Sequence, residues 1–342
     1  MQVHENYPLR DLNTFGIAET ARYFASFRDE FELEKLLAHY KKLSEVSKFP
    51  PIILGGGSNI LLTGKLNRMV LKNEIRGMDI IKEDSNHVYI KVGAGENWHH
   101  FVLFCLENNL GGAENLSLIP GNVGASPMQN IGAYGAELRE IFDELEAFDL
   151  QSGKAFMFSV NDCEFGYRES VFKRKFKDRF VILNVTYRMN KKHDYRISYG
   201  AISQELERMR VKDLSIQAIS QAVINIRTSK LPDPRVIGNA GSFFKNPTVS
   251  EGVYEKLGAK FPDIVAYPLE DGSMKLAAGW LIEQCGWKGY RKGDAGCHAQ
   301  QALVLVNYGN ARGSEINALG IEIAHSVKKK FGVQLEREVN LI

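Results

Sequence analysis

The sequence predicts a protein that mixes helices with short strands and binds its ligand through glycine-rich loops. Three observations support this prediction. Apolar stretches of strand length and stretches with helical periodicity follow one another along the 342 residues. Glycine-bearing turns near residues 55, 93 and 121 follow, or lie near, apolar segments. None of these turns fits the P-loop or the G-x-G-x-x-G pattern, so a dinucleotide could still bind but not by that fingerprint.

The composition is that of a soluble globular protein, with 44% hydrophobic and 25% charged residues. At this length we expect two or three domains. The net charge of +2 favours neither a nucleic-acid nor a membrane partner. Residues 1–10 contain no apolar signal core, and no apolar run is long enough to span a bilayer. We therefore expect a cytoplasmic protein.

The four cysteines are scattered and form no C-x-x-C pair; they are Cys105, Cys163, Cys285 and Cys297. This spacing fits a reducing cytosol better than a disulfide framework. His298 follows the last cysteine, but no partner at ligand spacing lies nearby, so we predict no metal site.

The elements are predicted from local patterns taken in chain order. Residues 13–16 form a turn, and Asp29 can cap a helix with an apolar face of Phe31, Leu33, Leu36 and Leu37. Helices are predicted at residues 29–40, 98–108, 215–228, 275–285 and 314–331. Strands are predicted at residues 51–54, 88–92, 180–189, 302–307 and 333–342, with a hairpin over 145–158 that turns at 151–154.

Residues 119–135, I-P-G-N-V-G-A-S-P-M-Q-N-I-G-A-Y-G, are predicted to form an ordered, ligand-binding loop. Its glycines and prolines suit neither a helix interior nor a central strand. Glycine lets the backbone approach a ligand, so that N–H groups can point at an anion. Gln129, Asn130 and Tyr134 add polar groups, and the tyrosine adds a stacking surface. The alternative is a surface loop without a ligand, although the apolar residues argue against disorder.

The triple glycine Gly55–Gly57 follows a short buried strand and precedes Ser58 and Asn59. This strand-to-loop transition suits phosphate binding through backbone N–H groups. A P-loop is excluded because leucine follows Gly64-Lys65, and the dinucleotide pattern fails because Ile60 and Trp98 hold its last position. Together the three glycine turns suggest loops that converge on one extended ligand with a pyrophosphate.

Two side chains are candidates for chemistry on residue type and neighbours. Arg168 lies among aromatic and small residues, where a guanidinium can be held rigid for bidentate contact with an anion, or it is a surface arginine. Ser242 can donate a proton to a substrate carbon, or it is a turn serine. A nucleophilic role is not favoured because Ala240 breaks the G-x-S-x-G pattern.

The C-terminal stretch contributes two carboxylates, Glu336 and Glu338, which face the same side of the strand predicted at 333–342. Both can be solvated, or one can point into a cleft with a raised pKa. We find no internal repeat and no low-complexity tract.

With these pieces in order, the sequence resembles the UDP-N-acetylenolpyruvoylglucosamine reductase family, the MurB flavoenzymes of bacterial peptidoglycan synthesis, and in particular its first type. The resemblance runs through nearly the whole chain. It rests on motifs at residues 13–16, 55–59, 119–135, 166–170, 238–247, 279–283 and 335–339.

The resemblance implies an α+β fold of the vanillyl-alcohol-oxidase type, which binds FAD without G-x-G-x-x-G. The expected parts are two FAD-binding subdomains, residues 1–75 and 76–229, and a substrate-binding domain, residues 230–335. The tail from about residue 336 is expected to return to the first subdomain. Residues 55–59 and 119–135 contain neither histidine nor cysteine, so the expected FAD is bound non-covalently.

The resemblance also implies the chemistry. NADPH reduces FAD, NADP leaves, and the enolpyruvyl sugar nucleotide takes its place. Hydride then passes from the flavin to the terminal vinyl carbon. Arg168 matches the arginine that stabilises the negative charge, Ser242 matches the proton donor, and Glu338 matches the catalytic glutamate beside the intermediate.

The cofactor-binding positions implied by the resemblance lie on the glycine loops and the first turn: Asn13, Thr14, Gly55, Gly56, Gly57, Ser58, Asn59, Pro120, Gly121, Gly124, Ala125, Gln129, Asn130, Ile131, Gly132, Ala133, Tyr134 and Gly135. The substrate-binding positions are Tyr167, Tyr199, Lys230, Asn246, Tyr267, Gln300 and Gln301. Among these, Lys230 is expected to meet the diphosphate, and Tyr199 is expected to close over it. Relatives often carry a basic residue where this chain has Asn340.

Two other functions stay open at this point. Another FAD oxidoreductase or oxidase of the same fold would explain the glycine loops but not Ser242 with Glu338. A nucleotide-binding module without activity would leave Arg168 unexplained. For the reductase we expect a monomer whose partners are UDP-N-acetylglucosamine enolpyruvate and NADPH.

Overall fold

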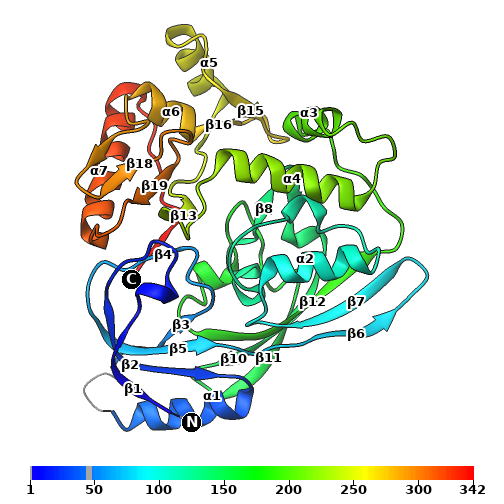
Figure 1. Ribbon diagram of the computed structural model, residues 1–342, viewed down its shortest axis with the longest axis vertical. Helices are drawn as coiled ribbons and strands as arrows, with labels where there is room; N and C mark the ends of the chain where they lie inside the picture. The colour runs from blue at the N-terminus through cyan, green and yellow to red at the C-terminus, as the bar shows by residue number, and fades with distance from the viewer. Residues whose placement is uncertain (1, 44–47) are drawn as a thin grey trace. The chain divides into compact units, whose positions relative to one another are not determined.

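The computed structural model describes residues 2–43 and 48–342 (Figure 1). The chain forms two compact units and passes between them more than once. Unit 1 contains Met1–Tyr7, Ala21–Gly56 and Leu66–Ser229, and unit 2 contains Pro8–Thr20, Gly57–Lys65 and Lys230–Ile342. The boundaries predicted for the subdomains and for the substrate domain stay a prediction.

A four-stranded sheet in unit 1 has the order β1-β2-β5-β3. Its strands are β1 (His4–Pro8), β2 (Thr20–Phe27), β5 (Leu66–Asn73) and β3 (Ile52–Leu54), of which the last three run parallel. Helix α1 (Glu30–Lys41) buries Leu33 and Leu36 in one cluster with Phe27 of β2. The predicted cap is confirmed, because the Asp29 carboxylate accepts the Glu32 N–H at 2.7 Å.

A five-stranded antiparallel sheet forms the larger part of unit 1, in the order β11-β10-β12-β7-β6. The strands are β11 (Lys154–Ser159), β10 (Phe142–Asp149), β12 (Phe180–Asn190), β7 (His87–Gly93) and β6 (Met78–Glu83). Helix α2 (Trp98–Glu107) packs Trp98 and Phe101 against Tyr187 of β12, with ring centroids 5.7 and 4.5 Å away. The predicted hairpin and both predicted strands of this sheet are confirmed.

Two further helices of unit 1, α3 (Gly200–Arg208) and α4 (Ile216–Lys230), share a buried cluster of apolar residues: Ile202, Leu206, Ile219, Ala222, Val223 and Ile226. Near the end of loop 119–135, strand β8 (Gly132–Ala133) pairs with β9 (Ala136–Glu137), which follows the loop. Single 3₁₀ turns occur through the chain at Arg10–Leu12, Glu114–Leu116, Val123–Ala125, Pro127–Gln129, Leu138–Glu140 and Val171–Lys173.

Unit 2 contains a sheet of order β13-β19-β18-β17, made of β13 (Gly238–Ser242), β19 (Val304–Asn307), β18 (Ala295–Cys297) and β17 (Arg291–Lys292). A second sheet joins β14 (Thr248–Val249), β16 (Met274–Leu276) and β15 (Ala266–Pro268). The helices are α5 (Glu251–Lys260), α6 (Ala278–Gln284) and α7 (Gly313–Phe331). A Cβ at Gly320 of α7 would lie 2.6 Å from the Phe243 ring, so only glycine permits this packing.

The tail of the chain also belongs to unit 2. Strand β20 (Asn340–Leu341) runs parallel to β4 (Ile60–Leu61), with Asn340 opposite Ile60. The Ile342 carbonyl accepts the Thr63 N–H at 2.8 Å. The last residues of the chain are therefore fixed beside the segment that follows the triple glycine.

Three predictions of secondary structure are wrong in detail. The helix predicted from residue 275 begins at Ala278, because Met274–Leu276 pair with two other strands instead. The strand predicted at 333–342 is reduced to the pair at Asn340–Leu341 and one bridge between Arg337 and Phe244. Phe31 is 62% exposed, so it lies outside the buried face of α1.

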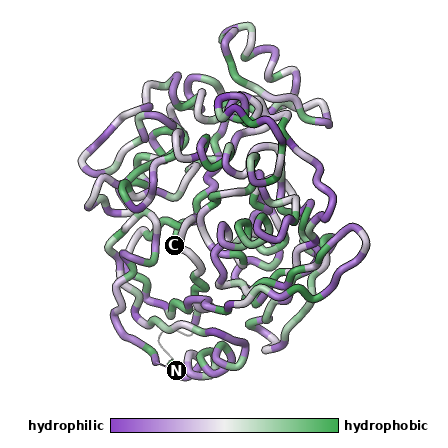
Figure 2. Tube along the Cα trace, turned by 45° about the vertical axis from the view of Figure 1, so that its right-hand side comes forward, coloured by the Kyte–Doolittle hydropathy of each residue, from purple (hydrophilic) through white to green (hydrophobic). Residues whose placement is uncertain are grey.

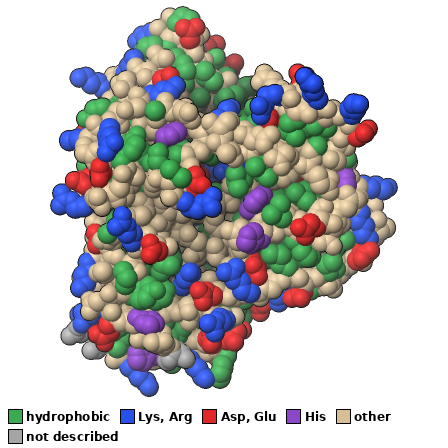
Figure 3. Space-filling model, viewed as in Figure 1, with side chains coloured by type: hydrophobic (Ala, Val, Ile, Leu, Met, Phe, Trp, Pro, Cys, Tyr) green, Lys and Arg blue, Asp and Glu red, His purple; other side chains and the backbone are tan. Residues whose placement is uncertain are grey.

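Hydrophobic and hydrophilic stretches alternate along the chain (Figure 2). Basic and acidic side chains are interspersed over the face shown in Figure 3, as the small net charge suggests. Within residues 2–43 and 48–342, no helix has the length and apolar character needed to cross a bilayer.

Candidate active site

The three glycine turns meet within unit 1. A Cβ at Gly56 would lie 2.9 Å from the Cα of Gly121, and a Cβ at Gly124 would lie 2.7 Å from the Cβ of Ala94. Hydrogen bonds join the last two turns, because Gly124 donates to the Ala94 carbonyl at 2.9 Å and Val123 donates to the Glu96 carbonyl at 2.8 Å. The three turns therefore lie close together, and their convergence on one extended ligand stays a prediction.

The triple glycine also contacts the first turn of the chain. The Thr14 N–H donates to the Gly57 carbonyl at 3.1 Å. Gly57 has a φ of +62°, and a Cβ there would lie 2.0 Å from the Leu12 carbonyl oxygen. Among the described residues, neither Gly56 nor Gly57 donates its amide N–H to a protein acceptor. Such backbone donors in a glycine loop suit a phosphate group.

Asn13, predicted to bind the cofactor, uses its side chain inside its own turn. Its amide donates to the carbonyls of Leu9 at 2.7 Å and Ile17 at 3.1 Å, and its oxygen accepts the Ile17 N–H at 2.9 Å. The residue is 6% exposed. The side chain therefore shapes the turn that presents Thr14 to the glycine loop.

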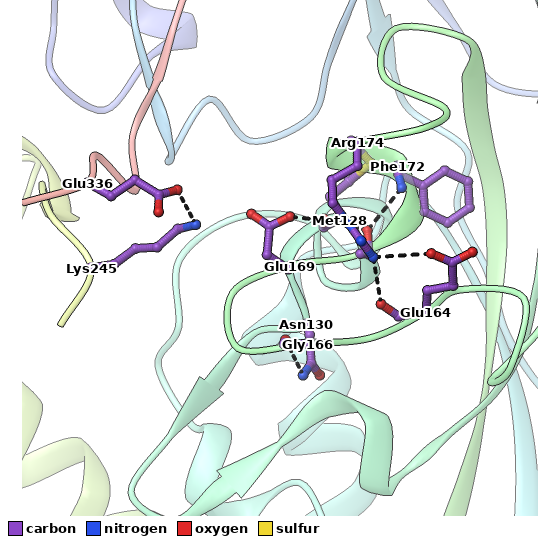
Figure 4. A network of polar contacts seen from close by, with 10 residues as sticks. Met128, Asn130, Glu164, Gly166, Glu169, Phe172, Arg174, Lys245 and Glu336 are labelled. Carbon is purple, nitrogen blue, oxygen red and sulfur yellow. Dashed lines mark hydrogen bonds and ion pairs between the residues drawn. The ribbon is translucent and has the colours of Figure 1, made fainter. Parts of the chain in front are cut away.

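Arg168 lies at the tip of a tight turn held by loop 119–135. Gly166 and Glu169 exchange backbone hydrogen bonds at 3.0 and 3.2 Å. The amide of the buried Asn130 donates to the Gly166 carbonyl at 3.0 Å (Figure 4), and the Ser170 hydroxyl donates to the Met128 carbonyl at 2.7 Å. The turn is therefore fixed by the same loop that was predicted to bind the cofactor.

The guanidinium of Arg168 is directed at that loop as well. It donates to the Gly132 carbonyl, and its Cζ lies 5.4 Å from the centroid of the Tyr167 ring. Arg168, Asn130 and Tyr134 all have positive φ, at +54°, +42° and +49°. Non-glycine residues in this region are strained, and such strain is concentrated at functional sites.

Tyr199, predicted to close over substrate, packs against Tyr134, with ring centroids 5.6 Å apart at an edge-on angle of 84°. The Asn115 amide joins the two segments, because it donates to the Tyr134 and Arg196 carbonyls at 2.9 Å each. Tyr199 is 46% exposed. The segment that carries it is thus attached to the cofactor loop while the aromatic side chain stays accessible.

Ser242 ends strand β13, whose pairing with β19 is interrupted by a bulge between Asn239 and Ser242. Gly241, within the bulge, has a φ of +70°. Bulges of this kind redirect a side chain next to an active site. The following residue, Phe243, accepts the Glu338 N–H at 2.9 Å. The structure therefore brings the predicted proton donor and the predicted glutamate together within unit 2.

The two C-terminal glutamates differ in environment. Glu336 has a side chain that is 70% exposed, and it pairs with Lys245 at 2.5 Å (Figure 4). Glu338 is half-buried, and its carbonyl accepts the Asn59 amide at 3.3 Å. Asn340 donates both its N–H and its side-chain amide to the Asn59 carbonyl, at 3.1 and 3.0 Å. Asn340 therefore stabilises the backbone of the glycine loop at Asn59.

The other predicted substrate positions divide between the units. Tyr167 and Tyr199 belong to unit 1 with Arg168, and the remainder belong to unit 2. The Asn246 side chain accepts the Ala278 N–H at 3.0 Å and so supports the start of α6. Gln301 accepts the Leu303 N–H at 3.4 Å. Lys230, Tyr267 and Gln300 are exposed.

Sequence reasoning missed two residues that the structure places beside this site. Asn115 carried no signal, because its two partners lie 19 and 81 residues away. Arg227, in contrast, did carry a signal in the sequence. It lies four residues after Val223 on α4, so it falls on the apolar face of that helix. A charged residue at such a position requires a partner.

Comparisons with known proteins cover the whole chain. The family model "FAD binding domain" matches residues 23–159, and "UDP-N-acetylenolpyruvoylglucosamine reductase, C-terminal domain" matches residues 233–342. The UDP-N-acetylenolpyruvoylglucosamine reductases of Amoebophilus asiaticus and Flavobacterium johnsoniae are 48% and 46% identical to it, over 100% of both chains in each case. That of Pseudomonas aeruginosa is 47% identical, over 100% of this chain and 99% of the relative. The chain belongs to the UDP-N-acetylenolpyruvoylglucosamine reductase family.

The fold agrees with that assignment. The crystal structure of MurB from Thermus caldophilus has a TM-score of 0.68 with this reductase, at 22% identity, over 100% of this chain and 99% of that one. The predicted α+β fold for FAD, distinct from the Rossmann fold, is confirmed, and the chain is an FAD-dependent oxidoreductase. The glycine loops fit this cofactor, because among the described residues the amides of Gly56 and Gly57 donate to no protein acceptor, and a Cβ at either position would clash with Gly121 or Leu12.

Proposed function

We propose that the protein reduces UDP-N-acetylglucosamine enolpyruvate to UDP-N-acetylmuramate with NADPH, through non-covalent FAD, in peptidoglycan precursor synthesis. The observation that carries this proposal is identity of 46–48% to named reductases over the full length of the chain. The positions of Arg168, Ser242 and Glu338 support it, since each lies on a backbone feature that fixes its place.

Bound FAD would supply the hydride chemistry between NADPH and the terminal vinyl carbon of the substrate. The amides of Gly56 and Gly57, with Thr14 beside them, would hold its pyrophosphate. Neither residues 55–59 nor residues 119–135 contain a histidine or cysteine that could attach the flavin covalently. The remaining cofactor positions predicted on these loops belong to the same proposal.

Arg168 would stabilise the negative charge that develops on the substrate carbon and its carboxylate. Its strained turn and its bond to Gly132 keep the guanidinium in place before substrate arrives. A fixed cation of this kind needs no reorganisation during the reaction.

Ser242 would donate the proton that completes the reduction, and Glu338 would lie beside the same intermediate. The bulge at Gly241 and the bond from Glu338 to Phe243 hold the two residues on neighbouring segments. Lys230 and Tyr199 would bind the diphosphate, and Tyr167, Asn246, Tyr267, Gln300 and Gln301 would complete the substrate site.

The predicted domains of the chain would have separate binding roles. Residues 1–75 and 76–229 would bind FAD, and residues 230–335 would bind the sugar nucleotide. Among the described cysteines three are buried and none is paired, which fits a reducing compartment. We expect a cytoplasmic monomer.

Product analysis tests the proposal. The purified protein is incubated with FAD, NADPH and the enolpyruvyl sugar nucleotide, and the product is examined by mass spectrometry. We expect the substrate to gain two hydrogen atoms, and we expect acid precipitation to release the yellow chromophore into the supernatant. Consumption of NADPH with oxygen as the only acceptor would contradict the proposal and favour an oxidase. Flavin retained in the precipitate would contradict non-covalent binding.

A further inference from the structure

Arg227 is a partly buried arginine whose Nε has no hydrogen-bond partner among the described residues. It lies on α4, next to Ile226 in the cluster shared with α3. Part of its surface is exposed, but its guanidinium Nε is buried and has no hydrogen-bond partner. Within residues 2–43 and 48–342 its side chain takes part in no hydrogen bond and no ion pair. A buried polar atom without a hydrogen-bond partner is unfavourable.

The groups around Arg227 do not neutralise it. Burial lowers the pKa of Arg227, and the nearby cation of Arg168 lowers it further, whereas Tyr134 acts in the opposite direction. Burial also lowers the pKa of His99, with His100 and Arg227 contributing. In the described part of the chain, no carboxylate is among the groups that act on Arg227. The surroundings are therefore cationic and phenolic.

The frame around Arg227 is fixed. The Ser220 and Ser117 hydroxyl oxygens, both buried, lie 2.7 Å apart, and the Gln217 amide donates to the Leu106 carbonyl at 2.9 Å. Both bonds fasten α4 to the segments beside it. The Tyr134 ring packs against the α3–α4 cluster. The helix that carries Arg227 is thus fixed in place, with Tyr134 of loop 119–135 packed against the cluster that contains its neighbour Ile226.

We propose that Arg227 is an anion-binding residue of unit 1 that acts together with Arg168 on one planar oxyanion beside loop 119–135. Two guanidinium groups repel each other unless an anion lies between them. The planar fork of arginine matches a delocalised anion better than a lysine point charge does. The proposal rests on the proposed function, which supplies two anions of this class: the pyrimidine edge of reduced flavin and the carboxylate of the substrate.

The matched variants are Arg227→Met, which keeps the length of the side chain without its charge, and Arg227→Lys, which keeps the charge. Arg208→Gln is the control, because Arg208 is an exposed arginine of α3 that pairs with Glu205 on its own helix. All three are made in the full-length chain and measured with and without FAD.

The first readout is the stability of the chain freed of flavin. If the buried Nε of Arg227 lacks a partner until a ligand binds, Arg227→Met leaves the melting temperature unchanged or raises it, since a buried polar atom without a hydrogen-bond partner is removed. A lower melting temperature, or failure of this variant to fold, would make Arg227 a packing residue and overturn the proposal.

The second readout separates the two anions. If the anion is flavin, Arg227→Met lowers the reduction equilibrium constant of bound FAD at least tenfold, a fall in midpoint potential of about 30 mV for a two-electron couple. If the anion is the substrate carboxylate, the potential is unchanged and the dissociation constant of the enolpyruvyl sugar nucleotide rises at least tenfold. In either case Arg227→Lys changes the affected quantity less than Arg227→Met does. Arg208→Gln has the same midpoint potential and the same substrate dissociation constant as the unmodified protein.

If Arg227→Met changes both the reduction equilibrium constant of bound FAD and the dissociation constant of the sugar nucleotide by less than twofold, the proposal is overturned. The proposed function fails separately, in the unmodified protein, if that protein takes up no FAD or forms no reduced product. An unmodified protein that turns over, beside an Arg227→Met variant with unchanged potential and substrate affinity, would reject the anion site alone.

Discussion

Buried asparagines hold the candidate active site together at the scale of single residues. Asn130 is fully buried, and its amide donates to Glu137 and to the Gly166 carbonyl at 3.0 Å each, while its oxygen accepts the Arg139 N–H at 3.1 Å. Asn115 and Asn13 make similar internal sets of bonds. These side chains position the groups proposed to meet a ligand, although the sequence suggested only that loop asparagines bind the ligand themselves.

Substitution of Ser242 tests the proposed proton donor. In Ser242→Ala we expect normal FAD content and normal reduction of flavin by NADPH, because the backbone bulge at Gly241 does not depend on the hydroxyl. Reoxidation by substrate should fall by about a hundredfold to a thousandfold, the usual loss for one group that stabilises a transition state. Stopped-flow absorbance of each half-reaction measures both quantities.

Ser250 provides the matched control. It is an exposed serine of unit 2 at the start of α5, and its side chain makes no capping hydrogen bond. Ser250→Ala should leave both half-reactions unchanged. Equal loss of both half-reactions in Ser242→Ala would reject the role of Ser242 in protonation.

At the scale of elements, an ion pair joins the ends of two strands of the five-stranded sheet. Asp149 ends β10, and Arg179 immediately precedes β12. Arg179 binds both carboxylate oxygens, at 3.0 and 2.9 Å, and Gln151 and Ser152 donate to the same carboxylate. The hydrogen-bonded Arg179 side chain, together with these two donors, holds the pKa of Asp149 well below its usual range.

Because of this ion pair, we expect the free energy of unfolding to depend on pH. Because the folded-state pKa is depressed, the stabilisation is fully present above the unfolded value of about 3.9 and is lost as the pH falls below it. Asp149→Asn should lower the free energy of unfolding by about 2 kcal/mol at pH 7, within the range for hydrogen bonds to charged groups. The deficit should shrink below about pH 4, as measured by urea denaturation.

Asp263→Asn is the control, because Asp263 is exposed. It should change the free energy of unfolding little at any pH. A deficit in Asp149→Asn that persists undiminished at pH 3 would show that the carboxylate does not act through its charge.

Most helices could be predicted from the sequence, and several strands of the second unit could not. Helix α7 has apolar residues at helical spacing and a C-terminal glycine, and α1 begins at a capping aspartate, so local pattern suffices. Strand β16 is three residues long and is formed by pairing with β14 and β15, which are distant in sequence. The tail was predicted as one strand from its alternation, but tertiary contacts give it only a bridge and a short pair.

The candidate site was predictable in its residue types rather than in its contacts. Residue types and neighbours left Arg168, Ser242 and the two C-terminal glutamates as open candidates, and the family resemblance implied roles for Arg168, Ser242 and Glu338. Glycine content indicated the loops. The bonds that fix them, such as Asn130 to Gly166 across 36 residues, depend on the folded chain. Arg227 was overlooked because the helix that carries it was interpreted by its apolar residues alone.

At the scale of the whole molecule, the chain order mixes the two units. Unit 2 takes two short segments from the N-terminal quarter of the chain, Pro8–Thr20 and Gly57–Lys65, besides its C-terminal part. The second of these segments pairs with β20 and binds Asn340. Residues proposed for the cofactor and for the substrate therefore occur in both units, so the proposed activity depends on the intact chain.

An anaerobic absorbance experiment in two steps tests the central claim most directly. NADPH is added to the purified yellow protein, and the enolpyruvyl sugar nucleotide is added after the oxidised flavin band has bleached. We predict bleaching in the first step and full return of the band in the second, without oxygen. A band that returns only when oxygen is admitted, or a protein that stays colourless in excess FAD, would contradict the proposed reductase.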